Sequence, residues 1–209
     1  MQAIAERYVT EAEYWEWEQS SPIKHEYFDG RLYAMSGGSN KHATLCLNAG
    51  ATLRGLLRGK PCRAVGSEQR VKIEATGLES YPYVAVHCPP FRFMGSQNEV
   101  LLNPTVIVEV LAPSTAGFDR GKKYEHYKQI ETLRDYLLVS QDSVHVDHYH
   151  RLENGDWLLQ TSIRMGDILT LEAIGCTLPL RDVYEDIEVP TRPELLRDAL
   201  TDEEVMRLF

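Results

Sequence analysis

The sequence predicts one α/β domain, and three observations support this fold class. A chain of 209 residues is long enough for one substantial domain, whereas two full domains are not expected. Helical and strand patterns follow one another in the order helix, three strands, helix, strand, which is typical of α/β proteins. Beyond them, an Asn-Gly turn at Asn154 separates two more strand-like segments and predicts a further β-hairpin.

The first predicted elements are a short helix, a hairpin and a long helix. Thr10 to Glu13 match a capping box, a pattern that marks the start of a helix. Residues 24–35 predict two short strands around an Asp-Gly turn. From Asn40 to Leu57 apolar residues recur at helical spacing, and Gly59 is a suitable terminator. We expect this long helix to pack across the sheet.

Four strands and one helix are predicted for the centre of the domain. The strands are Gln69 to Ile73, Val84 to Cys88, Val106 to Leu111 and Tyr136 to Ser140. Asp119 can cap a helix at residues 120–130, between the last two strands. The strands around the Asn-Gly turn, at residues 144–151 and 157–163, extend the sheet.

The last residues are predicted to be separate from the domain. A helical pattern restarts at Pro193, and a second capping box spans Thr201 to Glu204. We therefore expect residues 1–190 to form the single domain and residues 191–209 to be a C-terminal helical extension, which packs on that domain or on a partner chain.

Composition describes an ordinary soluble globular protein with excess negative charge. Hydrophobic residues make up 43% of the chain and charged residues 25%, so extended disorder is not expected. The net charge of −9 argues against a general polyanion-binding surface. Binding of nucleic acid therefore needs a local basic patch, or divalent cations that reduce the repulsion.

The sequence predicts a cytoplasmic protein without a membrane anchor. No apolar run approaches the roughly 20 residues that span a bilayer, and residues 1–7 lack the features of a signal peptide. The four cysteines lie far apart without zinc-ligand spacing, at Cys46, Cys62, Cys88 and Cys176. We expect all four to be reduced core residues in a reducing compartment.

One carboxylate, Glu109, lies within a run of aliphatic and β-branched residues at 103–111. An ionised group in a buried strand costs several kcal/mol unless it is paired or holds a metal. Glu109 therefore belongs to a functional site or is compensated by a specific cation. Lys122 and Lys123 follow shortly afterwards and can supply that cation.

Glu109 is one member of a set of residues with a recognisable spacing. The set comprises Glu26, Gly30, His42, the run from Glu109 to Thr115, Asp119, Lys123, Tyr127 and the strand from Tyr136 to Val139. With this spacing the chain resembles, over residues 8–184, the Uma-two family of restriction endonuclease-like proteins in the PD-(D/E)XK nuclease superfamily. The resemblance implies a restriction endonuclease-like core, a central mixed sheet flanked by helices, to which the C-terminal hairpin strands and the helical tail are added.

The resemblance implies metal-dependent hydrolysis of phosphodiester bonds in DNA. Hard cations such as Mg²⁺ or Mn²⁺ prefer carboxylate, carbonyl and water oxygens. Glu109 and the backbone carbonyl of Val110 would be ligands, and Glu26 would add a further carboxylate. Lys123 is the lysine that would position the attacking water.

Two further residues are candidates for contacts with phosphate, and the resemblance implies a second copy of the chain. His42, at the first turn of a helix, is a candidate for binding phosphate or for assisting proton transfer. Lys122 is another, and it is also the weaker alternative to Lys123 as the catalytic lysine. A homodimer is expected, because many nucleases address two strands.

Tyr83 departs from the pattern of the family. The family has Pro-Asp where this chain has Pro82-Tyr83, so a metal-binding aspartate is missing. A phenol has a reference pKa near 10, is neutral at neutral pH and is a poor ligand for a hard cation. Other carboxylates are candidate substitutes, namely Glu68, Glu79 and Asp119. The chain is thus predicted to be a nuclease with impaired activity, or alternatively a catalytically inactive binding or assembly protein of the same fold.

Several of these residues also have a purely structural interpretation. Glu109 and Lys123 can form a buried ion pair without a metal. Packing or a surface position explains His42, and a cross-strand ion pair within its hairpin explains Glu26. The sequence leaves both interpretations open.

The densest group of histidines is His145, His148 and His150. His148 and His150 share one face of a predicted strand because side chains alternate, so a transition-metal site is conceivable. The pattern offers no third ligand nearby, and polar residues that face water explain the group equally well.

Overall fold

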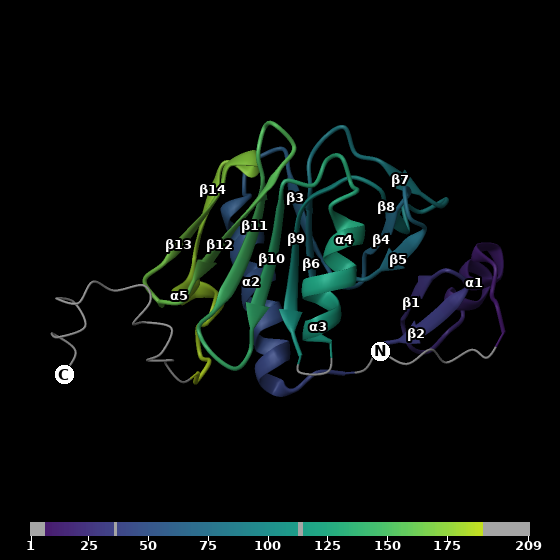
Figure 1. Ribbon diagram of the computed structural model, residues 1–209, viewed down its shortest axis with the longest axis horizontal. Coiled ribbons are helices and arrows are strands. Elements are labelled where there is room, and N and C mark those ends of the chain that lie inside the picture. The colour runs from purple at the N-terminus through teal and green to yellow at the C-terminus, as the bar shows by residue number, and fades with distance from the viewer. Residues whose placement is uncertain (1–6, 36, 113–114, 190–209) are drawn as a thin grey trace, which may run out of the picture.

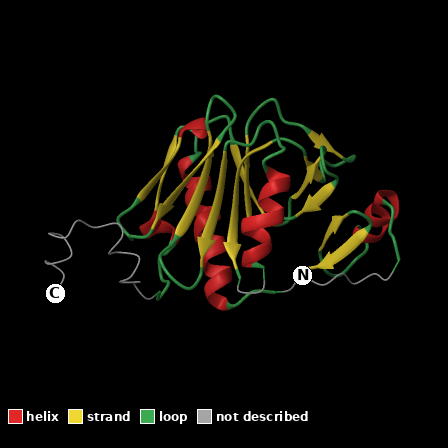
Figure 2. Ribbon diagram, in the orientation of Figure 1, coloured by secondary structure: helices red, strands yellow, loops and turns green. Residues whose placement is uncertain are grey.

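A mixed β-sheet of six strands lies at the centre of the structure, with helices on both faces (Figures 1 and 2). The computed structural model describes residues 7–35, 37–112 and 115–189. The strands run in the order β12-β11-β10-β9-β6-β3, and only β9 and β10 pair in parallel. Their bounds are β3 Arg63–Gly66, β6 Val84–His87, β9 Pro104–Leu111, β10 Asp135–Ser140, β11 Val146–Arg151 and β12 Trp157–Ser162.

Strand β9 explains why this sheet is covered on both faces. All of its residues are buried, because aliphatic and β-branched side chains point alternately to either side. Its valines at even positions pack in the core that contains α2 (Asn40–Leu56), whereas Ile107 and Leu111 pack in the core on the other face. Glu109 shares the face of Ile107 and Leu111.

The helix that follows β9 covers this second face and consists of three short segments. They are α3 (Ala116–Phe118), a π-helical turn (Asp119–Lys123) and α4 (Tyr124–Tyr127). The helix spans residues 116–127 instead of the predicted 120–130. The interpretation of Asp119 as a cap is wrong, because the chain already turns at Ala112 and places Thr115 at the N-cap position.

A second sheet lies to one side of the first, on the right in Figure 1, in the order β2-β1-β5-β4-β8-β7. Its strands are β1 His25–Phe28, β2 Arg31–Ala34, β4 Arg70–Ile73, β5 Leu78–Ser80, β7 Phe93–Met94 and β8 Val100–Leu101. The predicted hairpin is confirmed, and its turn at Asp29 and Gly30 has φ values of 46° and 71°. The predicted capping box is also confirmed, since Thr10 caps α1 (Glu11–Glu18).

A third, two-stranded sheet lies on the opposite side of the molecule, at the left in Figure 1. It consists of β13 Ile168–Leu171 and β14 Cys176–Pro179, joined by a 3-10 helix (Glu172–Ile174) and followed by α5 (Leu180–Val183). Leucines of these elements pack in the same core as α2. The sequence patterns did not predict these elements, because each is only a few residues long.

The cysteines differ from the prediction of four reduced thiols. Cys62 and Cys88 form a disulfide, whereas Cys46 and Cys176 are free. Strand β3 was not predicted, and its antiparallel register pairs Arg63 with His87. Cys62 directly precedes β3 and Cys88 directly follows β6, so the ladder brings these residues, 26 positions apart, into contact.

The predicted strands and the C-terminal hairpin β11–β12 occur at the predicted positions in the sequence, with shifts of one or two residues at their ends. The segment at Gln69 to Ile73 differs in its place, because it forms β4 of the second sheet instead of a strand of the central sheet. The predicted helical extension at residues 191–209 lies outside the described residues. Within the part of the chain that is described, no helix has the length and apolar character needed to cross a membrane.

Candidate active site

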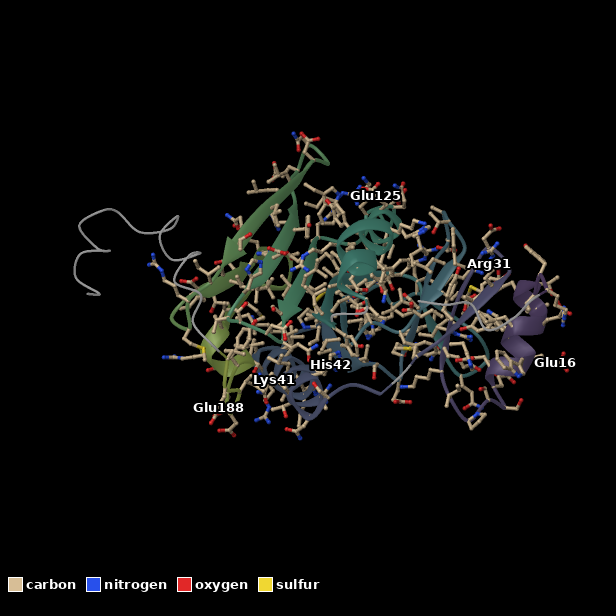
Figure 3. All side chains as sticks on the ribbon, turned by 60° about the horizontal axis from the view of Figure 1, so that its bottom comes forward. Glu16, Arg31, Lys41, His42, Glu125 and Glu188 are labelled. Atoms are coloured by element: carbon tan, nitrogen blue, oxygen red, sulfur yellow. A yellow bond between two sulfur atoms is a disulfide. The ribbon has the colours of Figure 1, made fainter. Side chains whose placement is uncertain are left out.

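Acidic and basic side chains from three parts of the fold meet in one cavity of about 750 Å³. Strand β1 supplies Glu26, β9 supplies Glu109, and the π-helical turn supplies Asp119 and Lys123. The start of α2 and the segment after β10 complete the lining with Ser39, Lys41, His42, Gln141 and Asp142. Figure 3 labels Lys41 and His42 at this end of α2.

The amino group of Lys123 is the centre of the cluster. Its Nζ lies 2.8 Å from Glu26 Oε1, 2.8 Å from Glu109 Oε1 and 3.7 Å from Asp119 Oδ1. All four residues are buried, so each contact is made away from bulk water. Burial opposes the charge of Lys123, but the surrounding carboxylates, with Glu109 first, raise its pKa well above the ordinary value. Lys123 therefore carries a proton at neutral pH.

Burial has the opposite effect on the acidic members of the cluster. It raises the pKa of Glu109 to about 7, although Lys123 lies beside it and Tyr127 donates a hydrogen bond of 3.1 Å to Oε1. Burial also raises the pKa of Asp119. The cluster thus holds more acidic groups than its single lysine can keep fully ionised.

His42 holds the end of β9 at the cavity. Its Nε2 donates a hydrogen bond of 3.2 Å to the backbone carbonyl of Val110, which fixes the ring orientation. Burial lowers the pKa of His42, so the ring is neutral at neutral pH. The carbonyl predicted to be a metal ligand therefore already has one hydrogen-bond donor.

Tyr83 lies in the cavity at the position of the missing aspartate. Its ring stands edge-on to His42, with 4.6 Å between the ring centroids. Burial, followed by the nearby charge of Glu109, raises the pKa of its phenol above the ordinary value. Tyr83 is therefore neutral and adds no negative charge to the site.

Most of the predicted site residues meet in this cavity, whereas Lys122 and Val110 are not among the residues that line it. Glu26, His42, Tyr83 and Glu109 all line it with Lys123. Lys122 is exposed and instead lines a smaller cavity between the hairpin and the helix after β9, with residues such as Phe28, Arg31 and His126. Successive side chains of the π-helical turn are rotated about the helix axis, so the two neighbouring lysines enter different cavities.

The three candidate substitutes for the missing acid have different surroundings. Glu68 is exposed and pairs with Lys24. Glu79 is buried in the second sheet, where Arg70 and the indole of Trp15 contact its carboxylate. Asp119 is the one of the three that lines the cavity.

Sequence patterns did not single out Ser39 and Gln141, which also line the cavity. Ser39 caps α2 by accepting a hydrogen bond from the His42 backbone, and its hydroxyl donates to Gln141 Oε1 at 3.0 Å. Gln141 follows β10 directly. Because β9 and β10 are parallel, the ends of both strands meet at this edge of the sheet, and that rule could have indicated Gln141.

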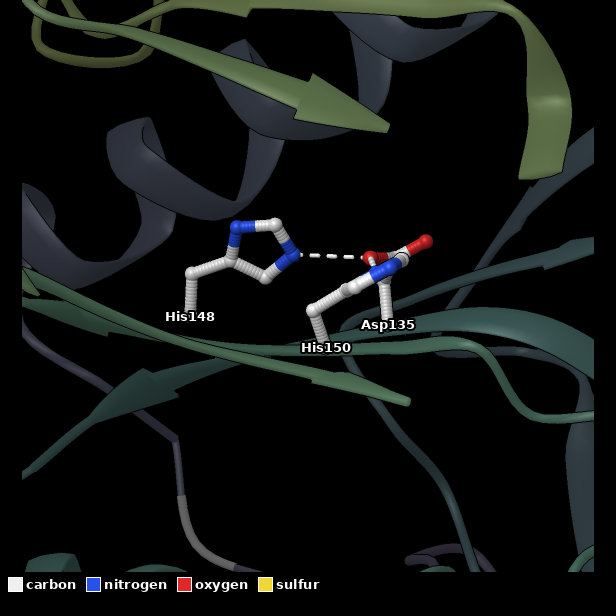
Figure 4. Close-up of side chains that lie close together, drawn as sticks. All are labelled: Asp135, His148 and His150. Atoms are coloured by element: carbon white, nitrogen blue, oxygen red, sulfur yellow. Dashed lines mark hydrogen bonds and ion pairs between the residues drawn. The ribbon is translucent and has the colours of Figure 1, made fainter. Parts of the chain in front are cut away.

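The histidine group lies outside this cavity. His148 and His150 share one face of β11 as predicted, and both contact Oδ1 of Asp135 (Figure 4). The expectation that no third ligand lies nearby is wrong, because Asp135 stands opposite His150 on β10. His145 is not part of this group and contacts Asp147 at 2.8 Å.

The fold and the cavity together define an α/β protein with a restriction endonuclease-like core. A solved structure described as "a putative nuclease belonging to DUF820", from Anabaena variabilis, has the same fold with a TM-score of 0.68. The two chains are 14% identical, and the match covers 83% of this chain and 96% of that chain. The predicted fold class is confirmed.

Sequence comparison identifies the family. The profile of the Uma2 family, described as "Putative restriction endonuclease", matches residues 11–181, so the chain belongs to this family. An uncharacterized protein of Synechocystis sp., slr1290, is 37% identical over 84% of this chain and 90% of its own length. A second one, sll1609, is 31% identical over 72% of this chain and 85% of its own length. The predicted family membership is confirmed.

Proposed function

We propose that this protein is a metal-dependent nuclease that hydrolyses phosphodiester bonds in DNA. The observation that carries this proposal is the Lys123 amino group, which lies 2.8 Å from the carboxylates of both Glu26 and Glu109. Asp119 lines the same cavity. The cavity therefore brings together an ammonium group, which can stabilise a phosphate, and several carboxylate oxygens, which can bind a metal ion. Phosphoryl chemistry requires both kinds of group.

The donor set suits a hard divalent cation. The raised pKa of Glu109, about 7, and the raised pKa of Asp119 reflect buried acids for which one lysine is insufficient compensation. Glu109, Asp119 and the Val110 carbonyl, which has a second lone pair beside its bond to His42, would hold Mg²⁺ or Mn²⁺. Such an ion would neutralise charge on the scissile phosphate and lower the pKa of a bound water.

The residues of the chain have separate roles in this proposal. Lys123 remains protonated, and its amino group can donate to the attacking water and to a phosphate oxygen. Glu26, which holds that amino group from the side of β1, can take the proton that the water releases. The water oxygen bonds to phosphorus while the bond to the leaving oxygen breaks, and the leaving oxygen takes up a proton from solvent.

We further propose that Asp119 supplies the carboxylate that Tyr83 lacks. Support comes from its place in the cavity 3.7 Å from Lys123, whereas Glu68 and Glu79 point to other partners. The neutral phenol of Tyr83 supports the second candidate, a binding or assembly protein without catalysis, because it removes one ligand charge from the expected set.

A homodimer that acts on both strands of DNA completes the proposal. Family membership supports the substrate, and the need to address two strands supports the dimer. The Cys62–Cys88 disulfide weighs against a strongly reducing compartment, because such bonds are rare there.

The test is DNA cleavage by metal-stripped protein after addition of Mg²⁺ or Mn²⁺, on plasmid and on single-stranded DNA. Glu109→Gln and Asp119→Asn remove one charge each with little change in size. Glu125→Gln is the matched control, because Glu125 lies on the same helix as Asp119, in its segment α4, but is exposed (Figure 3). Tyr83→Asp restores the carboxylate of the family pattern.

The outcomes separate the candidate functions. Cleavage by the wild type and by Glu125→Gln, lost in Glu109→Gln and Asp119→Asn, supports an active nuclease in which Asp119 serves as the second acid. Cleavage by Tyr83→Asp alone supports an impaired nuclease with an otherwise preserved site. Absence of cleavage by every folded variant rejects the nuclease and favours the binding protein.

A further inference from the structure

Three potential metal ligands from strands β10 and β11 converge on the sheet face opposite the candidate active site. In the antiparallel ladder Asp135 pairs with His150, and Leu137 pairs with His148. Side chains alternate along a strand, so Asp135, His148 and His150 project from the same face. Backbone register alone thus places one carboxylate and two imidazoles together.

The distances and the burial describe a compact group. Asp135 Oδ1 lies 2.7 Å from His148 Nε2 and 2.8 Å from His150 Nδ1, and the three ligand atoms all lie within 4.8 Å of one another. The side chains of Asp135 and His148 are 0% and 3% exposed, whereas that of His150 is 21% exposed. Figure 4 shows both rings directed at the carboxylate.

Asp135 lacks the compensation that the other buried acids have. Each of the other buried carboxylates among the described residues has a lysine or arginine partner, as the ion pairs of Glu26, Glu79, Glu109, Asp119 and Asp147 demonstrate. The described side-chain contacts of Asp135 go only to the two imidazoles, and its buried Oδ2 has no hydrogen-bond partner. A buried carboxylate with this environment is costly without a further cation.

We infer that Asp135, His148 and His150 form a binding site for a divalent transition-metal ion of the Zn²⁺ class. Two imidazole nitrogens favour such an ion over Mg²⁺, and Zn²⁺ also accepts a carboxylate oxygen as its third protein ligand. Three protein ligands leave the fourth position of a tetrahedral ion for water or a small ligand.

Binding requires the three ligand atoms, which lie within 4.8 Å of one another, to move to equal separations around the ion. Ligand atoms about 2.0–2.1 Å from a tetrahedral ion are about 3.3 Å apart, so the two hydrogen-bonded contacts open by about half an ångström. In the metal-free group each facing ring nitrogen donates its hydrogen to Oδ1. On binding, that hydrogen passes through solvent to the other ring nitrogen, so that the ring stays neutral and the freed lone pair becomes the ligand.

An open cavity gives the ion a route to the group. His150 lines a cavity of about 890 Å³, whose rim carries Glu131, Glu153 and Glu172 together with Arg134 and Arg151. The partly exposed imidazole of His150 therefore connects the buried Asp135 and His148 to solvent. Because the rim has both signs of charge, specificity for the ion comes from the three ligands.

The site is separate from the nuclease cavity. Glu109 pairs in register with Leu138, and Asp135 with Val106. Leu138 and Val106 belong to the cores on opposite faces of the sheet, so the two sets of acids are directed away from each other. Failure of the proposed nuclease activity therefore leaves this inference untouched.

Titration calorimetry of the metal-free full-length protein with Zn²⁺ tests the site, and the visible absorption of added Co²⁺ reports its coordination. His150→Ala is the central variant, because His150 is the most exposed of the three ligands, and Asp135→Asn is the second. His145→Ala is the matched control. His145 lies just before β11, its side chain is 19% exposed, and it pairs with Asp147. Glu109→Gln removes an acid of the other cavity.

We expect one Zn²⁺ per chain and tetrahedral Co²⁺ bands in the wild type, in His145→Ala and in Glu109→Gln. Loss of a residue that only hydrogen-bonds to a metal ligand weakens metal affinity by about 10–100-fold. His150→Ala removes a ligand itself, so it should weaken Zn²⁺ binding by at least about tenfold and remove the Co²⁺ bands. Absence of Zn²⁺ binding at millimolar concentration, or equal affinity of the wild type and folded His150→Ala, would overturn the inference. Circular dichroism verifies the folding of each variant.

Discussion

Replacement of Lys123 by methionine tests the buried charge cluster most directly. The amino group lies 2.8 Å from two carboxylates, and at an effective dielectric constant of about 20 each contact corresponds to about 6 kcal/mol of Coulomb attraction. Desolvation of the ions offsets much of this gain, and removal of one partner of a buried ion pair typically costs about 3–5 kcal/mol. We expect Lys123→Met to lower the free energy of unfolding by that amount at neutral pH. With a urea slope of about 3 kcal/mol/M, the midpoint of unfolding falls by about 1–1.7 M.

Lys128→Met is the matched control for this experiment. Lys128 pairs with Glu125 on the same helix, but the two side chains are 31% and 60% exposed, so its loss should cost less than about 0.5 kcal/mol. The deficit of Lys123→Met should shrink in acid, because the carboxylates that lose their cation take up protons. A deficit below about 1 kcal/mol, or one that does not change with pH, would refute the assignment of an ion-paired cluster.

Three other measurements test different parts of the structure. The pKa of Glu109 is raised from 4.5 to about 7, so the folded state holds this proton more tightly than the unfolded chain, and the stability that the proton contributes is lost as pH rises through about 7. Glu109→Gln should flatten that decline in thermal unfolding between acid and neutral pH, and an unchanged decline would contradict the assignment. The Cys62–Cys88 disulfide joins residues 26 positions apart, and Cys62→Ser combined with Cys88→Ser should cost about 3–4 kcal/mol by the chain-entropy relation, which calorimetry measures. An equal melting temperature would disprove that contribution. Leu45→Ala, at a fully buried position of α2, should cost about 2–5 kcal/mol in urea unfolding, whereas Leu47→Ala, at a position 70% exposed on the same helix, should change little.

Local patterns predicted the elements that depend on neighbouring residues in the sequence. The capping box at Thr10, the tight turn at Gly30 and the apolar spacing of α2 each involve residues within a few positions, and all three are confirmed. The family resemblance supplied Glu26, His42, Glu109 and Lys123 as a set, and the structure brings them to one cavity. Their chemical roles stay predictions.

Features that depend on strand register could not be predicted from the sequence. Cys62 and Cys88 meet because β3 pairs antiparallel with β6, and β3 is too short to give a pattern. Asp135 joins the histidines because β10 begins one residue earlier than predicted and pairs Asp135 with His150. Asp119 enters the cavity through a π-helical turn, whose extra residue per turn is a tertiary adjustment without a local signal.

The alternation of side chains along β9 and β10 keeps two chemically different donor sets apart. Glu109 faces the helix after β9 and offers oxygen atoms beside an ammonium group, a combination suited to a hard cation and a phosphate. Asp135 faces the opposite core and meets two imidazoles, which suit a transition metal. Because the packed sheet lies between the two sets, an ion bound at one cannot share ligands with the other. Mn²⁺ and Zn²⁺ titrations should therefore respond to different variants, Mn²⁺ to Glu109→Gln and Zn²⁺ to His150→Ala, and a common response of both ions to a single variant would mean that one site accounts for all metal binding.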